Sequence, residues 1–158
     1  MYKVLFVCTG NICRSPTAEA LFRDLVRKEG FSDRIATDSC GTGAWHVGHP
    51  PDPRTVATAR RRGVVMDDLR ARQLKASDFT DFDLLLAMDR SHLREMTAQC
   101  PPALRSKLRL FLDFAPTAGT AEVPDPYYGG PDGFEDVFDL VEEGARGLLA
   151  HLKANGVA

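Results

Sequence analysis

The sequence lacks long apolar runs and any strong excess of charge of one sign. A membrane-spanning helix needs roughly 20 consecutive apolar residues, and no stretch approaches that length, so we expect no membrane partner. The formal net charge is only −2, which gives no reason to expect nucleic acid as a partner. What remains is an ordinary globular composition, and 158 residues are enough for one domain with a sizeable core.

Cysteine is also scarce, with residues at positions 8, 13, 40 and 100 only. Their spacing does not match the paired ligands of a zinc site, so we expect no metal and no other cofactor. The first residues lack the pattern of a secretory signal, because their apolar run is short and leads directly into a polar motif. We therefore expect a reducing, cytoplasmic setting.

The chain is organised around residues 4–16. Val4–Val7 is a short apolar run rich in β-formers, which predicts a buried strand. Ser15 and Pro16 predict a helix start, with Ser15 as the N-cap, and an apolar helical face follows over residues 17–29. The segment between strand and helix is then a tight loop at a helix N-terminus, where backbone N–H groups and the helix dipole attract anions.

The side chains of this loop indicate what happens to the anion. Cys8 opens the loop and Arg14 closes it, so the amides between them can form a cradle with the sulfur at its floor. Such a position stabilises a thiolate, and the planar guanidinium of Arg14 can hold two phosphoryl oxygens. Gly10 permits unusual backbone geometry, Asn11 tolerates positive φ, and the Ser15 hydroxyl can also donate to the sulfur. A nucleophile under a phosphate cradle predicts phosphoryl transfer to sulfur.

The loop sequence Cys-Thr-Gly-Asn-Ile-Cys-Arg-Ser-Pro, residues 8–16, resembles the signature of the low-molecular-weight protein tyrosine phosphatases. Asp125-Pro126-Tyr127-Tyr128 resembles the general-acid motif of that family. Length and element order also fit, so the resemblance covers nearly the whole chain as a single domain, residues 1–158. It implies that the whole loop binds phosphate, through Thr9, Gly10, Asn11, Ile12, Cys13, Arg14 and Ser15.

The resemblance implies further roles outside the nucleophile. Trp45, Tyr127 and Tyr128 would form walls of the substrate cleft. Ser39 would help to hold Asn11 behind the loop. The second loop cysteine, Cys13, would pair with the nucleophile after oxidation and so protect it from irreversible oxidation. One departure from the family is Leu69, which stands where many relatives have a histidine in the hydrogen-bond network behind the loop.

The remaining chain alternates predicted strands and helices, which favours parallel pairing through right-handed crossovers. We expect a four-stranded parallel sheet flanked by helices, with the phosphate-binding loop after the first strand. The further strands are expected at residues 34–39, 82–88 and 108–112, and the further helices at 53–62, after Asp89, and at 134–153. In such sheets ligands bind beyond the carboxyl ends of the strands, where Cys8 lies.

Asp125 is the candidate for the second half of the chemistry. A tyrosine leaving group departs as a phenolate whose conjugate acid has a pKa of about 10, so a proton donor helps at neutral pH. Asp125 lies between Pro124 and Pro126, and a residue before proline is confined to extended geometry. A loop stiffened in this way can present a carboxyl group over a cleft.

Together these features predict a metal-independent protein-tyrosine phosphatase that works through a cysteinyl-phosphate. We expect a tyrosine-phosphorylated protein or an aryl phosphate as the partner, and a monomer or weak dimer. A phosphoarginine phosphatase of the same fold is an alternative, although those relatives tend to have Thr where this chain has Ile12. An arsenate reductase of the same fold is a further alternative, but it would relay a disulfide through additional cysteines, and Cys100 stands alone while Cys40 is in another loop. A phosphotyrosine-binding module without turnover would need neither Cys8 nor Asp125, and a redox module that uses Cys8 and Cys13 leaves Arg14 and Asp125 unexplained.

Overall fold

The structure, a computed structural model, describes residues 1–126, 130 and 132–158. Its centre is a parallel sheet with the strand order β2-β1-β3-β4, as the alternation of strands and helices predicts. The strands are β1 (Tyr2–Cys8), β2 (Ile35–Gly41), β3 (Leu84–Ala87) and β4 (Leu108–Leu110). The predicted four-stranded parallel sheet is therefore confirmed.

β1 lies between two partners and is buried on both faces. Its side chains alternate between the two faces, with Val4 and Phe6 in one apolar cluster and Leu5 and Val7 in the other. The ring of Phe6 meets those of Phe22 and Phe111 edge-on, with centroids 5.9 and 5.6 Å apart. This double burial explains why the stretch Val4–Val7 is continuously apolar rather than alternating.

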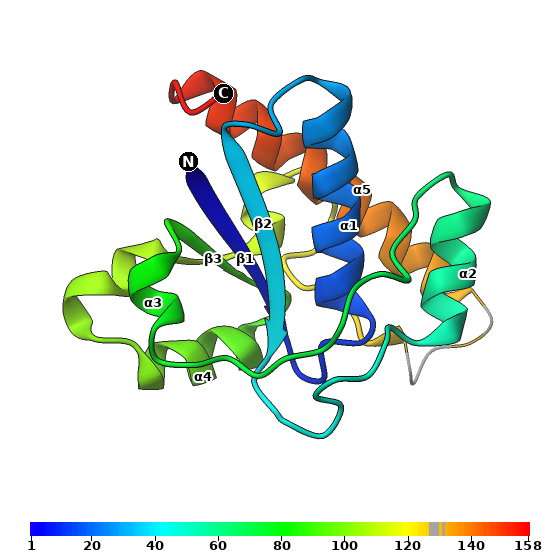
Figure 1. Ribbon diagram of the computed structural model, residues 1–158, viewed down its shortest axis with the longest axis horizontal. Helices are drawn as coiled ribbons and strands as arrows, with labels where there is room; N and C mark the ends of the chain where they lie inside the picture. The colour runs from blue at the N-terminus through cyan, green and yellow to red at the C-terminus, as the bar shows by residue number, and fades with distance from the viewer. Residues whose placement is uncertain (127–129, 131) are drawn as a thin grey trace.

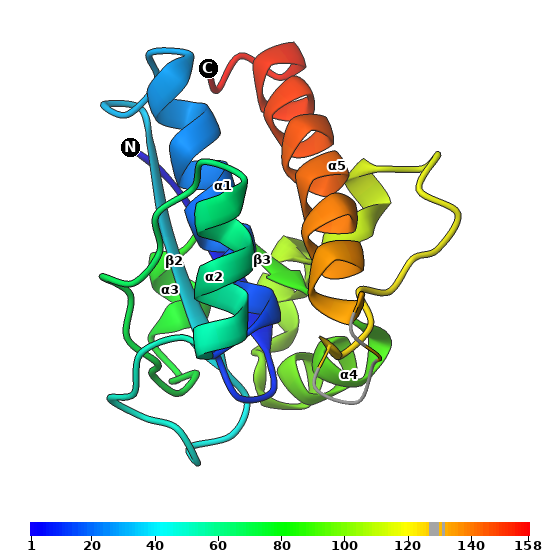
Figure 2. The same ribbon diagram turned by 90° about the vertical axis from the view of Figure 1, so that its right-hand side faces the viewer.

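The helices cover the sheet on both sides (Figures 1 and 2). One face is covered by α1 (Arg14–Lys28), α2 (Pro53–Arg61) and α5 (Gly133–Ala154). The other face is covered by α3 (Asp78–Asp81) and α4 (Arg90–Gln99). Both chain termini lie at one end of the sheet (Figure 2). The loop that follows β1 lies at the opposite end, away from both termini.

Several predicted boundaries differ from the structure. The third and fourth strands are shorter than predicted. The chain enters the third strand only at Leu84, and after Leu110 it leaves the sheet and turns into a 3-10 helix, η2 (Phe111–Phe114). The short helix α3 and a second 3-10 helix, η1 (Pro102–Lys107), were not predicted. Such single turns carry no periodic apolar pattern, so sequence periodicity does not reveal them.

The predicted start of α1 is wrong by two positions. The helix begins at Arg14 with Cys13 at the N-cap, and no side chain caps it. Ser15 lies inside the first turn, completely buried, and its hydroxyl is used by the loop instead of by the helix end. The hydrogen bonds of this hydroxyl to Cys8 and Asn11 thus replace the N-cap bond that serine ordinarily makes.

No helix within the described part of the chain is long and apolar enough to cross a membrane. Among the same residues, no group of three or more histidine, cysteine, aspartate or glutamate side chains could hold a metal ion.

Candidate active site

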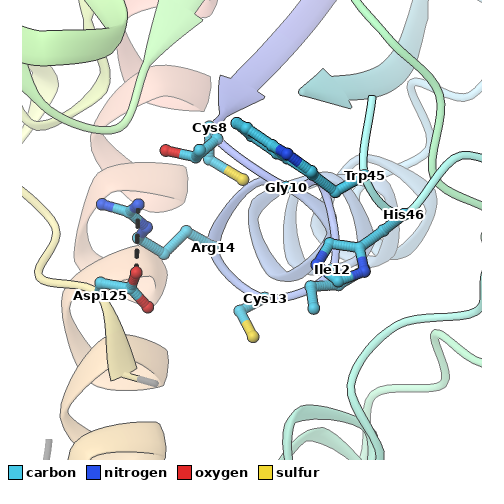
Figure 3. A pocket seen from close by; sticks show the side chains of 9 residues that line it. Cys8, Gly10, Ile12, Cys13, Arg14, Trp45, His46 and Asp125 are labelled. Atoms are coloured by element: carbon cyan, nitrogen blue, oxygen red, sulfur yellow. Dashed lines mark ion pairs between the residues drawn. The ribbon is translucent and has the colours of Figure 1, made fainter. Parts of the chain in front are cut away.

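A pocket of about 280 Å³ opens at the carboxyl end of β1. Its floor is the side chain of Cys8, which is the last residue of the strand and is only 3% exposed. Figure 3 shows Arg14 and Asp125 on one side of the pocket and Trp45 and His46 on the other. Segments far apart in the sequence therefore meet around one sulfur, as the rule for ligand sites in parallel sheets predicts.

The loop after Cys8 is held by its carbonyl groups. The carbonyl oxygens of Cys8, Thr9 and Ile12 accept hydrogen bonds from the N–H groups of Thr42, Gly43 and Asp52 at 2.8, 3.0 and 2.9 Å. In a planar trans peptide the N–H of the next residue points the opposite way. The N–H groups of Thr9, Gly10 and Cys13 are thus turned away from the 42–52 segment. The N-terminus of α1 at Arg14 adds the positive end of a helix dipole to the same loop.

Asn11 determines the direction of the hydrogen bonds behind the sulfur. Its φ of 57° is the positive value expected for this residue, and its Oδ1 accepts the backbone N–H of Arg72 at 3.0 Å. The amide nitrogen Nδ2 must therefore donate, and it reaches the Oγ atoms of Ser15 at 2.8 Å and Ser39 at 2.9 Å. Because Ser15 Oγ accepts from Asn11, its own proton can be given to the Cys8 sulfur, 2.9 Å away.

The network ends on a buried carboxyl group that the sequence did not single out. The Ser39 hydroxyl donates to Glu19 Oε1 at 2.7 Å. Burial raises the pKa of Glu19 to about 7, while the hydrogen bond from Ser39 opposes this shift. The position expected for a histidine is occupied by Leu69, which packs against the apolar core. Asn11 is nevertheless held on both ends of its amide, so the network exists without that histidine.

Arg14 is buried and held by groups from two other segments. Its Nη1 atom donates to Asp89 Oδ2 at 2.9 Å and to the Val123 carbonyl at 3.1 Å. Asp89 is the N-cap of α4, as predicted, and its Oδ1 accepts the N–H of His92. Burial would raise the pKa of Asp89, but hydrogen bonds from Ser91, from the His92 backbone and from Arg14 hold it below its ordinary value. A carboxylate therefore fixes the guanidinium from behind.

The partnership between Asp89 and Arg14 was missed at the sequence level. The pattern identified Asp89 only as the start of a helix, because capping is a local signal. Its second role depends on a contact across 75 positions of the chain, which no local pattern reveals. His92 was missed for the same reason, although it is 1% exposed and its imidazole contacts both Thr9 and Arg14.

Asp125 lies at the rim of the pocket. Its Oδ2 atom is 3.8 Å from Arg14 Nη2, and the side chain is 39% exposed. The carboxyl group is thus close to the guanidinium and open to an incoming substrate (Figure 3). Tyr127 and Tyr128, the other residues of the motif, lie outside the described residues.

The opposite wall is formed by the loop that follows β2. Trp45 lines the pocket with its side chain 72% exposed, so it does not belong to the core. His46 lies beside it, and a Cβ added to Gly10 would come within 2.9 Å of the His46 ring. Gly10 itself has no positive φ, so the space beside His46, not unusual backbone geometry, is what requires glycine there.

Ile12 and Cys13 complete the lining. Cys13 is 7% exposed, and burial raises the pKa of its thiol to about 12. It is therefore a neutral thiol at neutral pH. The structure thus brings together all the loop residues that the sequence indicated, with Asp125 and Trp45 around them.

Comparison with known proteins gives consistent matches over the whole chain. The family model described as low molecular weight phosphotyrosine protein phosphatase matches residues 3–158. A low molecular weight phosphotyrosine protein phosphatase of Schizosaccharomyces pombe is 52% identical over 148 residues, which are 93% of this chain and 94% of the relative. A protein tyrosine phosphatase of Entamoeba histolytica has a similar crystal structure, with a TM-score of 0.95, 38% identity and 99% coverage of both chains. The drosophila arginine phosphatase is also similar, with a TM-score of 0.87, 35% identity and coverage of 96% and 98%.

Proposed function

Because the chain belongs to the low molecular weight phosphotyrosine protein phosphatase family, it is a protein-tyrosine phosphatase, and we propose that Cys8, Arg14 and Asp125 perform its reaction. The observation that carries this assignment is that the three side chains line one pocket at the end of β1. The thiol is at the floor, the guanidinium is beside it, and the carboxyl group is at the rim.

The first step is the transfer of the phosphoryl group to sulfur. Arg14 and the amides of residues 9–15 bind the phosphate dianion and stabilise the charge that develops in the transition state. The Cys8 thiolate attacks phosphorus in line, and the bond between phosphorus and the tyrosine oxygen breaks. Asp125 gives its proton to the departing phenolate. The product is a cysteinyl-phosphate and a free tyrosine side chain.

The second step returns the enzyme to its starting state. Asp125, now ionised, takes a proton from a water molecule as that water attacks phosphorus. The bond between phosphorus and sulfur breaks, and inorganic phosphate leaves. The Ser15 hydroxyl, 2.9 Å from the sulfur, donates to the thiolate as it re-forms. Apart from the attacking water, both steps use only side chains and amides of the chain itself.

The substrate class follows from the walls. Trp45 offers an exposed aromatic face to a phosphotyrosine ring, and Ile12 adds an apolar surface. A phosphoarginine substrate would present a charged, planar group to the same walls. We therefore place aryl phosphates first, with phosphoarginine as the alternative that the test below includes.

The test is phosphate release from matched phosphotyrosine, phosphoserine and phosphoarginine peptides, under reducing conditions and with a chelator present. We expect release from phosphotyrosine alone and none from Cys8→Ser, which keeps its affinity for phosphate. Preference for phosphoarginine would overturn the substrate assignment. Turnover by Cys8→Ser would overturn the nucleophile.

The role of Asp125 has its own test in the leaving group. Asp125→Asn is expected to lower kcat/KM, which reports the transfer of the phosphoryl group to sulfur, by about 10²–10⁴ on phosphotyrosine, the usual contribution of general acid catalysis. The loss is expected to shrink on an aryl phosphate whose leaving group is already acidic, because that group needs no proton. Equal losses on both substrates would contradict the assignment as proton donor.

We also propose that Cys13 protects the nucleophile during oxidation. The sulfenic acid formed on Cys8 by peroxide would condense with the Cys13 thiol, giving a disulfide and releasing water. Because the Cys13 thiol is neutral, peroxide is expected to oxidise Cys8 and not Cys13. After peroxide treatment, thiol is expected to restore the wild type but not Cys13→Ala. Equal recovery of both would contradict this role.

A further inference from the structure

His92 is a buried side chain to which the reaction steps above assign no task. It belongs to the first turn of α4 and is 1% exposed. Its Nε2 atom is 2.7 Å from Thr9 Oγ1 in the phosphate loop and 3.4 Å from Arg14 Nη2. Its Nδ1 atom accepts the backbone N–H of Asp89 at 3.2 Å. One imidazole thus bonds to the loop and to the start of the helix that holds the guanidinium, and it packs against the guanidinium itself.

These contacts determine where the ring carries its proton. The N–H of Asp89 is a fixed donor, so Nδ1 must be the acceptor, and the proton of a neutral ring is then on Nε2. From there it is donated to Thr9 Oγ1. The 3.4 Å contact between Nε2 and Arg14 Nη2 is then a packing contact and not a hydrogen bond, because both nitrogens are donors. The charges that face the ring are Arg14, Asp89, Asp125 and Glu122. Burial, and then the positive charge of Arg14, lowers the pKa of His92 to about 4, so the ring is neutral at physiological pH.

We propose that His92 is a positioning residue, which fixes the Thr9 side chain and the Arg14 guanidinium in one arrangement before the phosphate arrives. This rests on the proposed function, because Thr9 and Arg14 matter as parts of the phosphate site. The Nε2–H to Thr9 bond holds the first loop residue after the nucleophile. The Nδ1 bond completes the cap at Asp89, whose other carboxylate oxygen holds Arg14.

The advantage of this arrangement is a site that needs little reorganisation when substrate binds. Polar groups aimed at the reacting atoms in advance stabilise developing charge without a further cost of ordering. Because Thr9 Oγ1 accepts a hydrogen bond from His92, the hydroxyl proton of Thr9 stays available to donate to another acceptor, such as a bound phosphate. Losing the bond releases Thr9 and weakens phosphate binding and turnover together.

The test uses variants that separate the bond to Thr9 from the cap. His92→Asn is short enough to keep an acceptor near the Asp89 N–H, but it cannot reach Thr9. Thr9→Val removes the acceptor with little change of shape, and Thr9→Ser restores it. Ser91→Ala removes the hydroxyl donor to Asp89 and weakens the cap without touching Thr9. For each variant, kcat/KM on a phosphotyrosine peptide, the Kd for inorganic phosphate and Tm are measured.

We expect His92→Asn and Thr9→Val each to lower kcat/KM about three- to tenfold, as for the loss of one neutral hydrogen bond. The double variant is expected to lose no more than the worse single variant, because both remove the same bond. Thr9→Ser is expected to recover most of the loss seen in Thr9→Val. Ser91→Ala is expected to be additive with Thr9→Val.

Independent losses in the double variant, or a His92→Asn enzyme as active as the wild type, would overturn the proposal. So would non-additivity of Ser91→Ala with Thr9→Val, because the effect would then come from the cap. If the wild type released no phosphate from the peptide, the proposed function would fail instead. The Kd for inorganic phosphate would still decide whether His92 and Thr9 are coupled.

Discussion

Replacing Glu19 with glutamine gives a test of the buried network in which both sign and size follow from the structure. Glu19 is 7% exposed and accepts the Ser39 hydroxyl at 2.7 Å. Burial raises its pKa from 4.5 to about 7, with a smaller contribution from Asp38, while the hydrogen bond from Ser39 and the charge of Arg23 act in the opposite direction. The folded protein therefore binds this proton more tightly than the unfolded chain does.

The consequence for stability has a definite direction. A carboxyl group with a raised pKa in the folded state makes its full contribution to stability below pH 4.5, and loses it as the pH rises through about 7. A rise from 4.5 to about 7 corresponds to about 3 kcal/mol. Glu19→Gln has no charge to bury, and its amide oxygen can still accept the Ser39 proton. It is expected to lie within about 1 kcal/mol of the wild type at pH 5 and to be more stable by about 3 kcal/mol at pH 8.

The assay is urea denaturation followed by circular dichroism, for both proteins, between pH 5 and pH 8. Glu143→Gln, on the exposed side of α5, is the matched control and is expected to leave the pH dependence unchanged. If wild type and Glu19→Gln lost stability in parallel over this range, Glu19 would not be the group that titrates, and the reasoning from its burial would be refuted.

Three further substitutions test the site and the packing around it. Asp89→Asn is expected to lower kcat/KM about 10- to 100-fold through loss of the charged bond to Arg14, while α4 keeps its cap because asparagine caps a helix as well as aspartate does. Trp45→Ala is expected to raise KM for a phosphotyrosine peptide about two- to tenfold at constant kcat and Tm, through loss of aromatic stacking. Gly147→Ala would place a Cβ atom 1.8 Å from the Phe114 carbonyl oxygen. It is expected to lower the free energy of unfolding in urea by about 1–3 kcal/mol or more, while the folded fraction keeps its kcat; unchanged stability would contradict the close packing of α5.

The sequence predicted those parts of the molecule that depend on local patterns. The apolar run of β1, the loop from Cys8 to Arg14 and the start of α4 at Asp89 each have a signal within a few residues. The parallel sheet follows from the order of these elements along the chain. Signals of this kind also locate Cys8, the proposed nucleophile, because it lies at the end of the first strand.

The parts that were missed depend on contacts between distant segments. Ser15 was predicted as a helix cap because serine favours that position, but its hydroxyl is hydrogen-bonded to Asn11 and Cys8 instead. Burial of Glu19 beside Ser39 has no counterpart in the sequence pattern, since an isolated glutamate on a helix is usually solvated. The role of His92 needs the contact with Thr9 across 83 positions. These features can be recognised only once the folded structure shows which distant segments are in contact.

The placement of β1 between β2 and β3 has a consequence for how readily different parts of the proposed site open locally. Amides in the doubly paired, buried stretch Val4–Val7 are expected to exchange their hydrogens with solvent only when the whole molecule opens, whereas surface loops open at much lower cost. The thiol is attached to the former, and the walls around Trp45 and Asp125 belong to the latter. Specificity can therefore drift or be redesigned by exchanging loops, while the chemistry beneath them stays on the slowest-exchanging part of the protein.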